Sequence, residues 1–246
     1  MTSTAKVRAV TFDGIRRALS SVEAAALAGI AAAVLLSVSA YLLARQPGVR
    51  TAATDPSWYA DDGNRSTVMV GLNLAPLGVI AFLWFMAVVR RRLGDHEDRL
   101  FATVFLGSGL AFAVLTLVAA VAAAIPTLVV RFGTQPVPDD TTVTLAHALW
   151  FGLWGICASR LVGVFIAATS TVGARFGSFP RWLSVFGLVL GAVLGVTGAF
   201  AGPLDFLFPM WLVVVSVTLL LNRRAGGPVA GADGSPGARH GPELIG

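Results

Sequence analysis

Long apolar runs separated by short polar segments dominate the chain from residue 22 onward. A transmembrane helix needs about 20 mostly apolar residues to cross a hydrocarbon core roughly 30 Å thick. Inside a bilayer the backbone must satisfy its own hydrogen bonds, which favours helices for all of these runs. We therefore expect spans at about residues 22–44, 68–89, 100–130, 143–169, 182–201 and 203–221.

Two of these runs depart from the standard length. The run 100–130 is longer than a bilayer requires, so we expect it to tilt or to change direction near Pro126. The last run is adequate only if Pro203 is its first helical residue, and Asp205 would then lie in the first turn, where the helix dipole favours a carboxylate. The predicted fold class is an all-α membrane protein, a bundle of six transmembrane helices.

The distribution of positive charge predicts the orientation of this bundle, because cytoplasmic loops carry an excess of Lys and Arg. The chain has 18 Lys and Arg residues. With a cytoplasmic N-terminus, Arg160 falls inside a span and four fall on the outer side, which leaves 13 in the cytoplasm. The outer four are Arg45, Arg50, Arg65 and Arg131. Both termini are therefore expected to be cytoplasmic.

The pattern divides the chain into a membrane domain, residues 22–222, and two flanking segments. In residues 1–21, Phe12, Ile15 and Leu19 have helical spacing beside arginines, which indicates a short helix lying on the inner leaflet. Residues 223–246 are rich in Gly, Pro and Ala and are expected to form a disordered cytoplasmic tail. The first span is too long for a usual signal peptide, so we expect an uncleaved anchor.

Composition agrees with a membrane location. The chain is 56% hydrophobic and 13% charged, whereas a soluble domain has about 25% charged residues. The net charge of +5 comes from short clusters between apolar runs, so nucleic acid is not an expected partner. One cysteine and three histidines exclude an intramolecular disulfide and make a metal site or another cofactor unexpected.

Small residues recur at helical spacing in two spans. Gly187, Gly191 and Gly195 form a GxxxGxxxG stripe, and a matching stripe in the preceding span consists of Gly155, Ser159 and Gly163. Small residues allow membrane helices to approach closely, so these stripes predict helix packing within the monomer. A dimer interface is the alternative, and a homo-oligomer or another membrane protein would then be the partner.

Arg160 is the one charged residue near the middle of a span, where insertion costs roughly 2.5–3.5 kcal/mol. Ser108 lies at a similar predicted depth, and Glu23 marks the inner end of the first span. We predict a polar cluster of these three residues near the inner leaflet. The alternative is an arginine that extends to the headgroups and helps to set orientation.

Asn73 and His147 form a second candidate set near the outer face. His147, Trp150 and Trp154 share one helix face, which a haem or quinone site could use. Trp and polar residues are also normal at this depth without any ligand. Ser108 and His147 lie at different depths, beyond the reach that a nucleophile and its base require, and no catalytic residues are predicted.

Two stretches resemble a bacterial, actinobacterial-type family of six-span integral membrane proteins of unknown function. They are the segment SFPRWLSVFGL at 178–188 and the run AFLWF at 81–85, the latter followed by an arginine-rich turn and RLFATVFLGSG at 99–109. The resemblance covers most of residues 20–222 and implies the fold without an activity.

The sequence thus predicts a multi-pass protein of the bacterial plasma membrane, in contact with the lipid bilayer. A non-enzymatic interaction, sensing or envelope-associated component is the leading hypothesis. A small-solute or ion transporter or channel that uses Arg160 is the alternative, and it requires a water-accessible path across the bundle. A lipid- or quinone-active enzyme is the second alternative, which a molecule bound at the Trp150–Trp154 face would favour.

Overall fold

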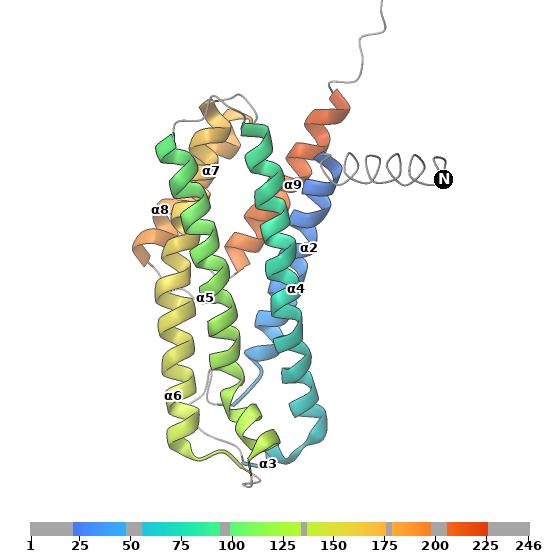
Figure 1. The fold of residues 1–246 in the computed structure, drawn as a ribbon, viewed down its shortest axis with the longest axis vertical. Coiled ribbons are helices and arrows are strands. Elements are labelled where there is room, and N and C mark those ends of the chain that lie inside the picture. The colour runs from blue at the N-terminus through green and yellow to red at the C-terminus, as the bar shows by residue number, and fades with distance from the viewer. Residues whose placement is uncertain are drawn as a thin grey trace, which may run out of the picture.

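The computed structural model describes residues 22–47, 56–93, 99–133, 137–175, 179–197 and 206–225. All regular structure in these ranges is helical (Figure 1). The predicted helix within residues 1–21 and most of the predicted tail lie outside them. The helices in chain order are α2 (Val22–Leu43), α3 (Pro56–Ala60), α4 (Asp62–Leu93), α5 (Arg99–Phe132), α6 (Asp140–Trp150), η1 (Phe151–Ala158), α7 (Ser159–Arg175), α8 (Arg181–Thr197) and α9 (Leu207–Ala225).

Four stretches of helix in the described ranges are long and apolar enough to cross a membrane. They are Glu23–Leu43, Asp62–Arg90, Ala102–Phe132 and Asp140–Arg175, and the last combines α6, η1 and α7 into one run. The predicted all-helical architecture is therefore confirmed for the described ranges, and four of the predicted apolar runs form membrane-compatible helices. Although Pro126 lies inside it, α5 continues as one helix to Phe132.

The long helices run side by side along the vertical axis of Figure 1. We call the end where α4 ends and α5 begins the upper end, and the end where α5 ends and α6 begins the lower end. α2 packs antiparallel to α4, since Gly78 of α4 faces Leu36 of α2 and Gly71 faces Leu42 and Leu43. α2 begins and α9 ends at the upper end, so the described chain enters and leaves the bundle on the same side (Figure 1).

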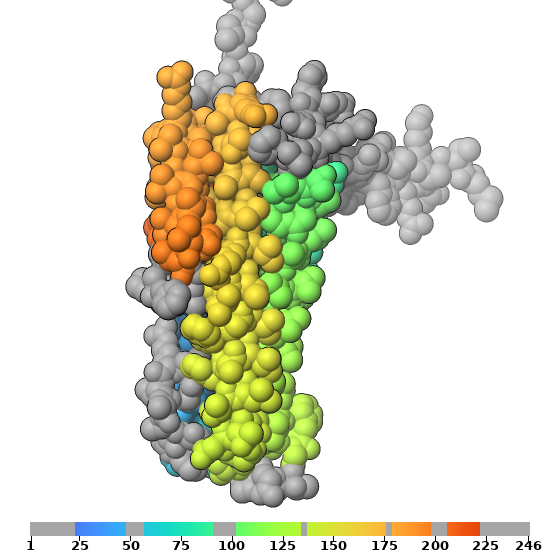
Figure 2. Space-filling view, turned by 90° about the vertical axis from the view of Figure 1, so that its left-hand side faces the viewer, coloured from blue at the N-terminus to red at the C-terminus, as the bar shows by residue number. Residues whose placement is uncertain are grey.

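The two shorter apolar helices, α8 and α9, accompany only the upper part of the long helices (Figures 1 and 2). They contain 17 and 19 residues, a rise of about 25–28 Å at 1.5 Å per residue. α8 packs against the second half of the α6–η1–α7 run, where Gly187 faces Ser170 and Gly191 faces Gly163. α8 is thus shorter than the predicted span 182–201, whereas α9 begins and ends four residues later than the predicted span 203–221. Residues 198–205 lie outside the described ranges.

Exposed apolar side chains form a band around the bundle. On α5 this band runs from Val104 to Val129, a rise of about 37 Å. A hydrocarbon core of roughly 30 Å crossed by a tilted helix requires a band of about this height. The outward-facing surface of the described helices is therefore suited to lipid rather than to water.

The core of the upper half is aromatic. Phe82 of α4 lies edge-to-face against Phe112, Phe165 and Phe208, with ring centroids 5.4, 5.2 and 5.8 Å apart. Such pairs add about 0.5–1.5 kcal/mol each beyond the burial of area. Because these rings come from α4, α5, α7 and α9, this cluster fixes the position at which α9 begins.

Candidate functional site

A pocket of about 160 Å³ opens in the lower half of the bundle, between α2 and the η1–α7 segment. We call it the lateral pocket. Most of its lining is apolar or aromatic, and Tyr41, Arg45, Ser37 and Ser159 add polar groups. Its lining residues are Leu36, Ser37, Ala40, Tyr41, Ala44, Arg45, Phe112, Trp150, Trp154, Ala158, Ser159, Val162, Leu194, Phe206, Phe208 and Pro209.

The pocket follows from the short reach of α8 and α9. Above it, these helices fill the space between α2 and α7, and Leu194 at the end of α8 and Phe208 at the start of α9 form its roof. Below this level the described helices leave α2 and η1 facing one another, with Phe112 of α5 behind them. Tyr41 is 57% exposed and Phe206 is 47% exposed, so the pocket opens on the side of the bundle.

One wall of the pocket belongs to a π-helix, η1, in which the Ser159 N–H donates to the carbonyl of Trp154, five residues earlier. π-helical segments are rare and frequently lie at functional sites. Trp154 lines the pocket and packs against Phe112, with ring centroids 6.1 Å apart. The Ser159 side chain also lines the pocket, and its hydroxyl donates to the Gly155 carbonyl at 2.6 Å.

The lower rim of the pocket carries a positive charge. Arg45 follows the end of α2, and its guanidinium carbon lies 6.0 Å from the centre of the Tyr41 ring. Both side chains are exposed. Within the described ranges Arg45 forms no ion pair, whereas Arg65, at the same end of the bundle, pairs with Asp62.

A buried amide at the lower end joins α2 to α5. Gln46 is only 2% exposed. Its Nε2 donates to the Ala123 carbonyl at 2.8 Å, and its Oε1 accepts a hydrogen bond from the Thr127 hydroxyl at 2.9 Å. These partners flank Pro126, where the helix lacks one backbone donor. The apolar pattern does not predict this contact, and its only local signal is a lone glutamine directly after an apolar run.

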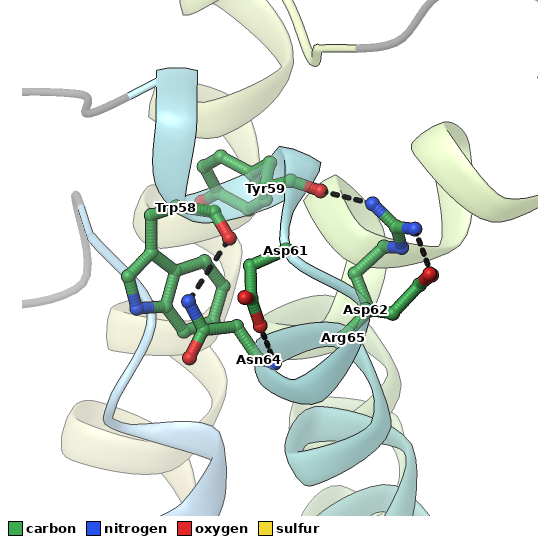
Figure 3. Close-up of polar contacts among 6 residues, drawn as sticks. All are labelled: Trp58, Tyr59, Asp61, Asp62, Asn64 and Arg65. Carbon is green, nitrogen blue, oxygen red and sulfur yellow. Dashed lines mark hydrogen bonds and ion pairs between the residues drawn. The ribbon is translucent and has the colours of Figure 1, made fainter.

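The short helix α3 closes the lower end by folding onto the start of α4 (Figure 3). The Asp61 carboxylate accepts the Asn64 N–H at 2.8 Å, as expected of a helix N-cap, and the Asn64 amide donates to the Trp58 carbonyl at 3.1 Å. The Arg65 guanidinium bonds both to the Tyr59 carbonyl and to the Asp62 carboxylate. This small network fixes the loop that precedes α4.

Tyr59 is the buried part of this lower-end network. Its side chain is fully buried, and its hydroxyl donates to the Pro47 carbonyl at 3.1 Å. Burial disfavours the charged phenolate and raises the pKa of Tyr59 to about 12. The hydroxyl therefore serves as a structural donor rather than as an acid or base.

Arg160 and Ser108, two members of the predicted cluster with Glu23, each bond to their own helix rather than to one another. The Arg160 side chain is exposed and donates to the Ile156 carbonyl of its own helix at 2.8 Å. Ser108 is buried and donates to the Val104 carbonyl at 2.6 Å, also in its own helix. Glu23 is exposed in the first turn of α2. A functional role for the three residues stays a prediction.

Asn73 and His147 lie on helices separated by α5, which packs against both α4 and α6. The exposed Asn73 amide donates to the Met69 carbonyl at 2.7 Å. The His147 ring lies 6.0 Å from the ring of Trp150, and its buried Nδ1 has no hydrogen-bond partner among the described residues. Trp150 and Trp154, predicted to share a face with His147, both line the lateral pocket.

Only part of each small-residue stripe lies in the contact between α7 and α8. A Cβ atom on Gly163 would lie 2.7 Å from the Gly191 carbonyl oxygen, and one on Gly187 would lie 1.9 Å from the Ser170 hydroxyl. A Cβ atom on Gly195 would meet nothing within 4 Å. The preceding stripe divides, because Gly155 is buried in η1 whereas Ser159 lines the pocket.

Across the described ranges, no three His, Cys, Asp or Glu side chains gather as they would around a metal ion. No family model, curated protein or solved structure matches the chain. The resemblance to a six-span bacterial family therefore stays a prediction, and function has to be argued from the site itself.

Proposed function

We propose that the chain is a multi-pass protein of the bacterial plasma membrane that acts as a non-catalytic interaction, sensing or envelope-associated component. In this proposal α8 and α9 complete a six-helix membrane domain from the cytoplasmic side, and both termini are cytoplasmic. The exposed apolar band supports the membrane position. The excess of arginines predicted for the cytoplasmic side supports the orientation, because α4 ends and α5 begins with arginines at the upper end.

One observation favours this role over transport. Several polar side chains of the long helices donate to carbonyls one turn earlier in their own helices, as Thr116 does to Phe112 and Thr169 to Phe165. Arg160 does the same and does not line the lateral pocket. A transport path would instead require polar groups directed at a shared aqueous route.

Single cysteines test the orientation, because the chain has one native cysteine, Cys157. In a Cys157→Ala background, Thr141→Cys reports the lower end and Arg90→Cys reports the upper end. We expect a membrane-impermeant maleimide to label intact spheroplasts at residue 141 only, and residue 90 only after lysis. Labelling of residue 90 in intact spheroplasts would refute the proposed orientation.

Flux measurements test the transport alternative. Proteoliposomes that contain the protein should be no leakier to protons, chloride or small organic anions than liposomes without it. Flux that Arg160→Leu abolishes, while Arg131→Leu leaves it intact, would establish the alternative in place of the proposal.

A further inference from the structure

We propose that the lateral pocket binds an anionic phospholipid of the leaflet at the lower end, with its phosphate at Arg45 and the end of one acyl chain inside the pocket. This inference rests on the proposed membrane position, although not on which leaflet faces the cytoplasm. It assigns a ligand to the Trp150–Trp154 wall, to the arginine at the rim and to the space below α8 and α9.

The size and lining of the pocket fit a hydrocarbon chain. A volume of about 160 Å³ is close to that of an engineered apolar cavity of roughly 150 Å³ that binds benzene. Leu36, Phe112 and Leu194 at the inner part offer no charge to a ligand. Since the opening faces the medium that surrounds the exposed apolar band, an acyl chain can enter sideways without leaving hydrocarbon.

The geometry along α2 fits one leaflet. Arg45 at the rim and Leu36 at the inner end are nine positions apart, a rise of about 13 Å. Half of a hydrocarbon core roughly 30 Å thick is about 15 Å. A phosphate held at Arg45 therefore places its chain end at the depth of Leu36 and the Phe208 roof.

The charge at the rim favours an anionic headgroup. Exposed Arg45 forms no ion pair within the described ranges, and the Tyr41 ring beside it limits the directions that the guanidinium can take. A guanidinium recognises phosphate through paired N–H donors, more strongly than neutral donors do. A headgroup with net negative charge leaves this attraction unopposed, whereas the choline of a zwitterionic lipid offsets it.

Headgroup selectivity is tested with the full chain in nanodiscs that contain equal amounts of phosphatidylglycerol and phosphatidylcholine. Native mass spectrometry counts the lipids that the released protein retains. We expect the wild type and Arg45→Lys to retain phosphatidylglycerol in preference to phosphatidylcholine. In Arg45→Gln the ratio of retained phosphatidylglycerol to phosphatidylcholine should fall about fivefold. Arg131→Gln, which removes another exposed arginine at the lower end, is the matched control. Equal behaviour of the Arg45→Gln and Arg131→Gln variants would overturn the assignment of the phosphate.

Chain binding is tested with phospholipids brominated near the chain end, which quench nearby tryptophans. Ala40→Phe places a ring in the pocket, and Val38→Phe places the same ring on the exposed face of α2. We expect Ala40→Phe to reduce quenching, and a Trp154→Phe variant to identify the tryptophan responsible. Val38→Phe should leave quenching at the wild-type level. Undiminished quenching in Ala40→Phe, with helix content retained, would refute the pocket as the site.

The proposed function and this inference fail in different ways. A chain that does not insert, or that shows the opposite labelling pattern, contradicts the function proposed above. A chain that inserts as expected but shows no dependence on Arg45 or Ala40 contradicts only the lipid site.

Discussion

Individual polar residues in this bundle fall into two groups that the sequence does not distinguish. Asn73 and Arg160 attract attention as polar residues in apolar runs, yet both are exposed and bond to their own helices. Gln46 lies at the end of a run, and its side chain connects the end of α2 to α5. The partner of a side chain depends on helix rotation and register, which apolar periodicity alone does not determine.

The role of Gln46 leads to a prediction for stability. Gln46→Leu removes the bonds to the Ala123 carbonyl and the Thr127 hydroxyl and leaves both groups buried. We expect a loss of about 1–2 kcal/mol in the free energy of unfolding in mild detergent, because buried polar groups lose their partners. Asn73→Leu is the control, and its change should stay within about 0.5 kcal/mol. Equal losses in the two variants would show that the Gln46 hydrogen bonds do not stabilise the contact between α2 and α5.

At the scale of the element, the sequence predicted the apolar helices but not their ends or their hydrogen-bond register. The described part of α8 ends at Thr197, whereas the predicted apolar run continues to residue 201. η1 has the same apolar pattern as an α-helix. Its i→i+5 hydrogen bond, from the Ser159 N–H to the Trp154 carbonyl, is not encoded in that pattern. The lateral pocket depends on both features and could not be predicted.

Contact between α7 and α8 depends on particular glycines rather than on the whole stripe. Gly163→Ala should destabilise the pair by about 1–3 kcal/mol, because its Cβ would meet the Gly191 carbonyl and backbone cannot move aside cheaply. Gly195→Ala should be neutral or slightly stabilising, since its Cβ enters open space and alanine favours helix. Thermal unfolding in detergent compares the two variants. A Gly195→Ala variant that unfolds earlier than Gly163→Ala would contradict this register.

The start of α6 should depend on pH. Asp139 caps this helix, and hydrogen bonds from the Thr142 side chain lower the pKa of its carboxyl below the usual 3.8. A lowered folded-state pKa contributes stability above pH 3.8, and this contribution disappears as pH falls through the folded pKa. The protection of the amides at residues 141–144, measured against their intrinsic exchange rates at each pH, should therefore decrease in acid. Asp139→Asn keeps a capping side chain, so its exchange protection should lack this acid dependence; an unchanged acid response would assign it to another group.

At the scale of the whole molecule, the band of exposed apolar side chains predicts a preferred bilayer. Its height of about 37 Å on α5 exceeds a typical hydrocarbon thickness. A thin bilayer must therefore become thicker next to the bundle, or the helices must tilt. We expect the melting temperature in nanodiscs to rise from 14-carbon to 18-carbon phosphatidylcholine chains. A higher melting temperature in the thinner bilayer would place part of the band outside the hydrocarbon.

The limited reach of α8 and α9 also gives the molecule a taper. Among the described residues, the upper half is built from α2, α4, α5, α7, α8 and α9, whereas the lower half is built from α2, α4, α5 and α6 with η1, and the short α3 lies at its end. Each helix has a diameter of about 10 Å, so the described helices occupy less area in one leaflet than in the other. Lipids in the leaflet at the lower end must fill the area that the additional helices occupy in the other leaflet. The bundle therefore fits best in a bilayer whose two leaflets contain different amounts of lipid.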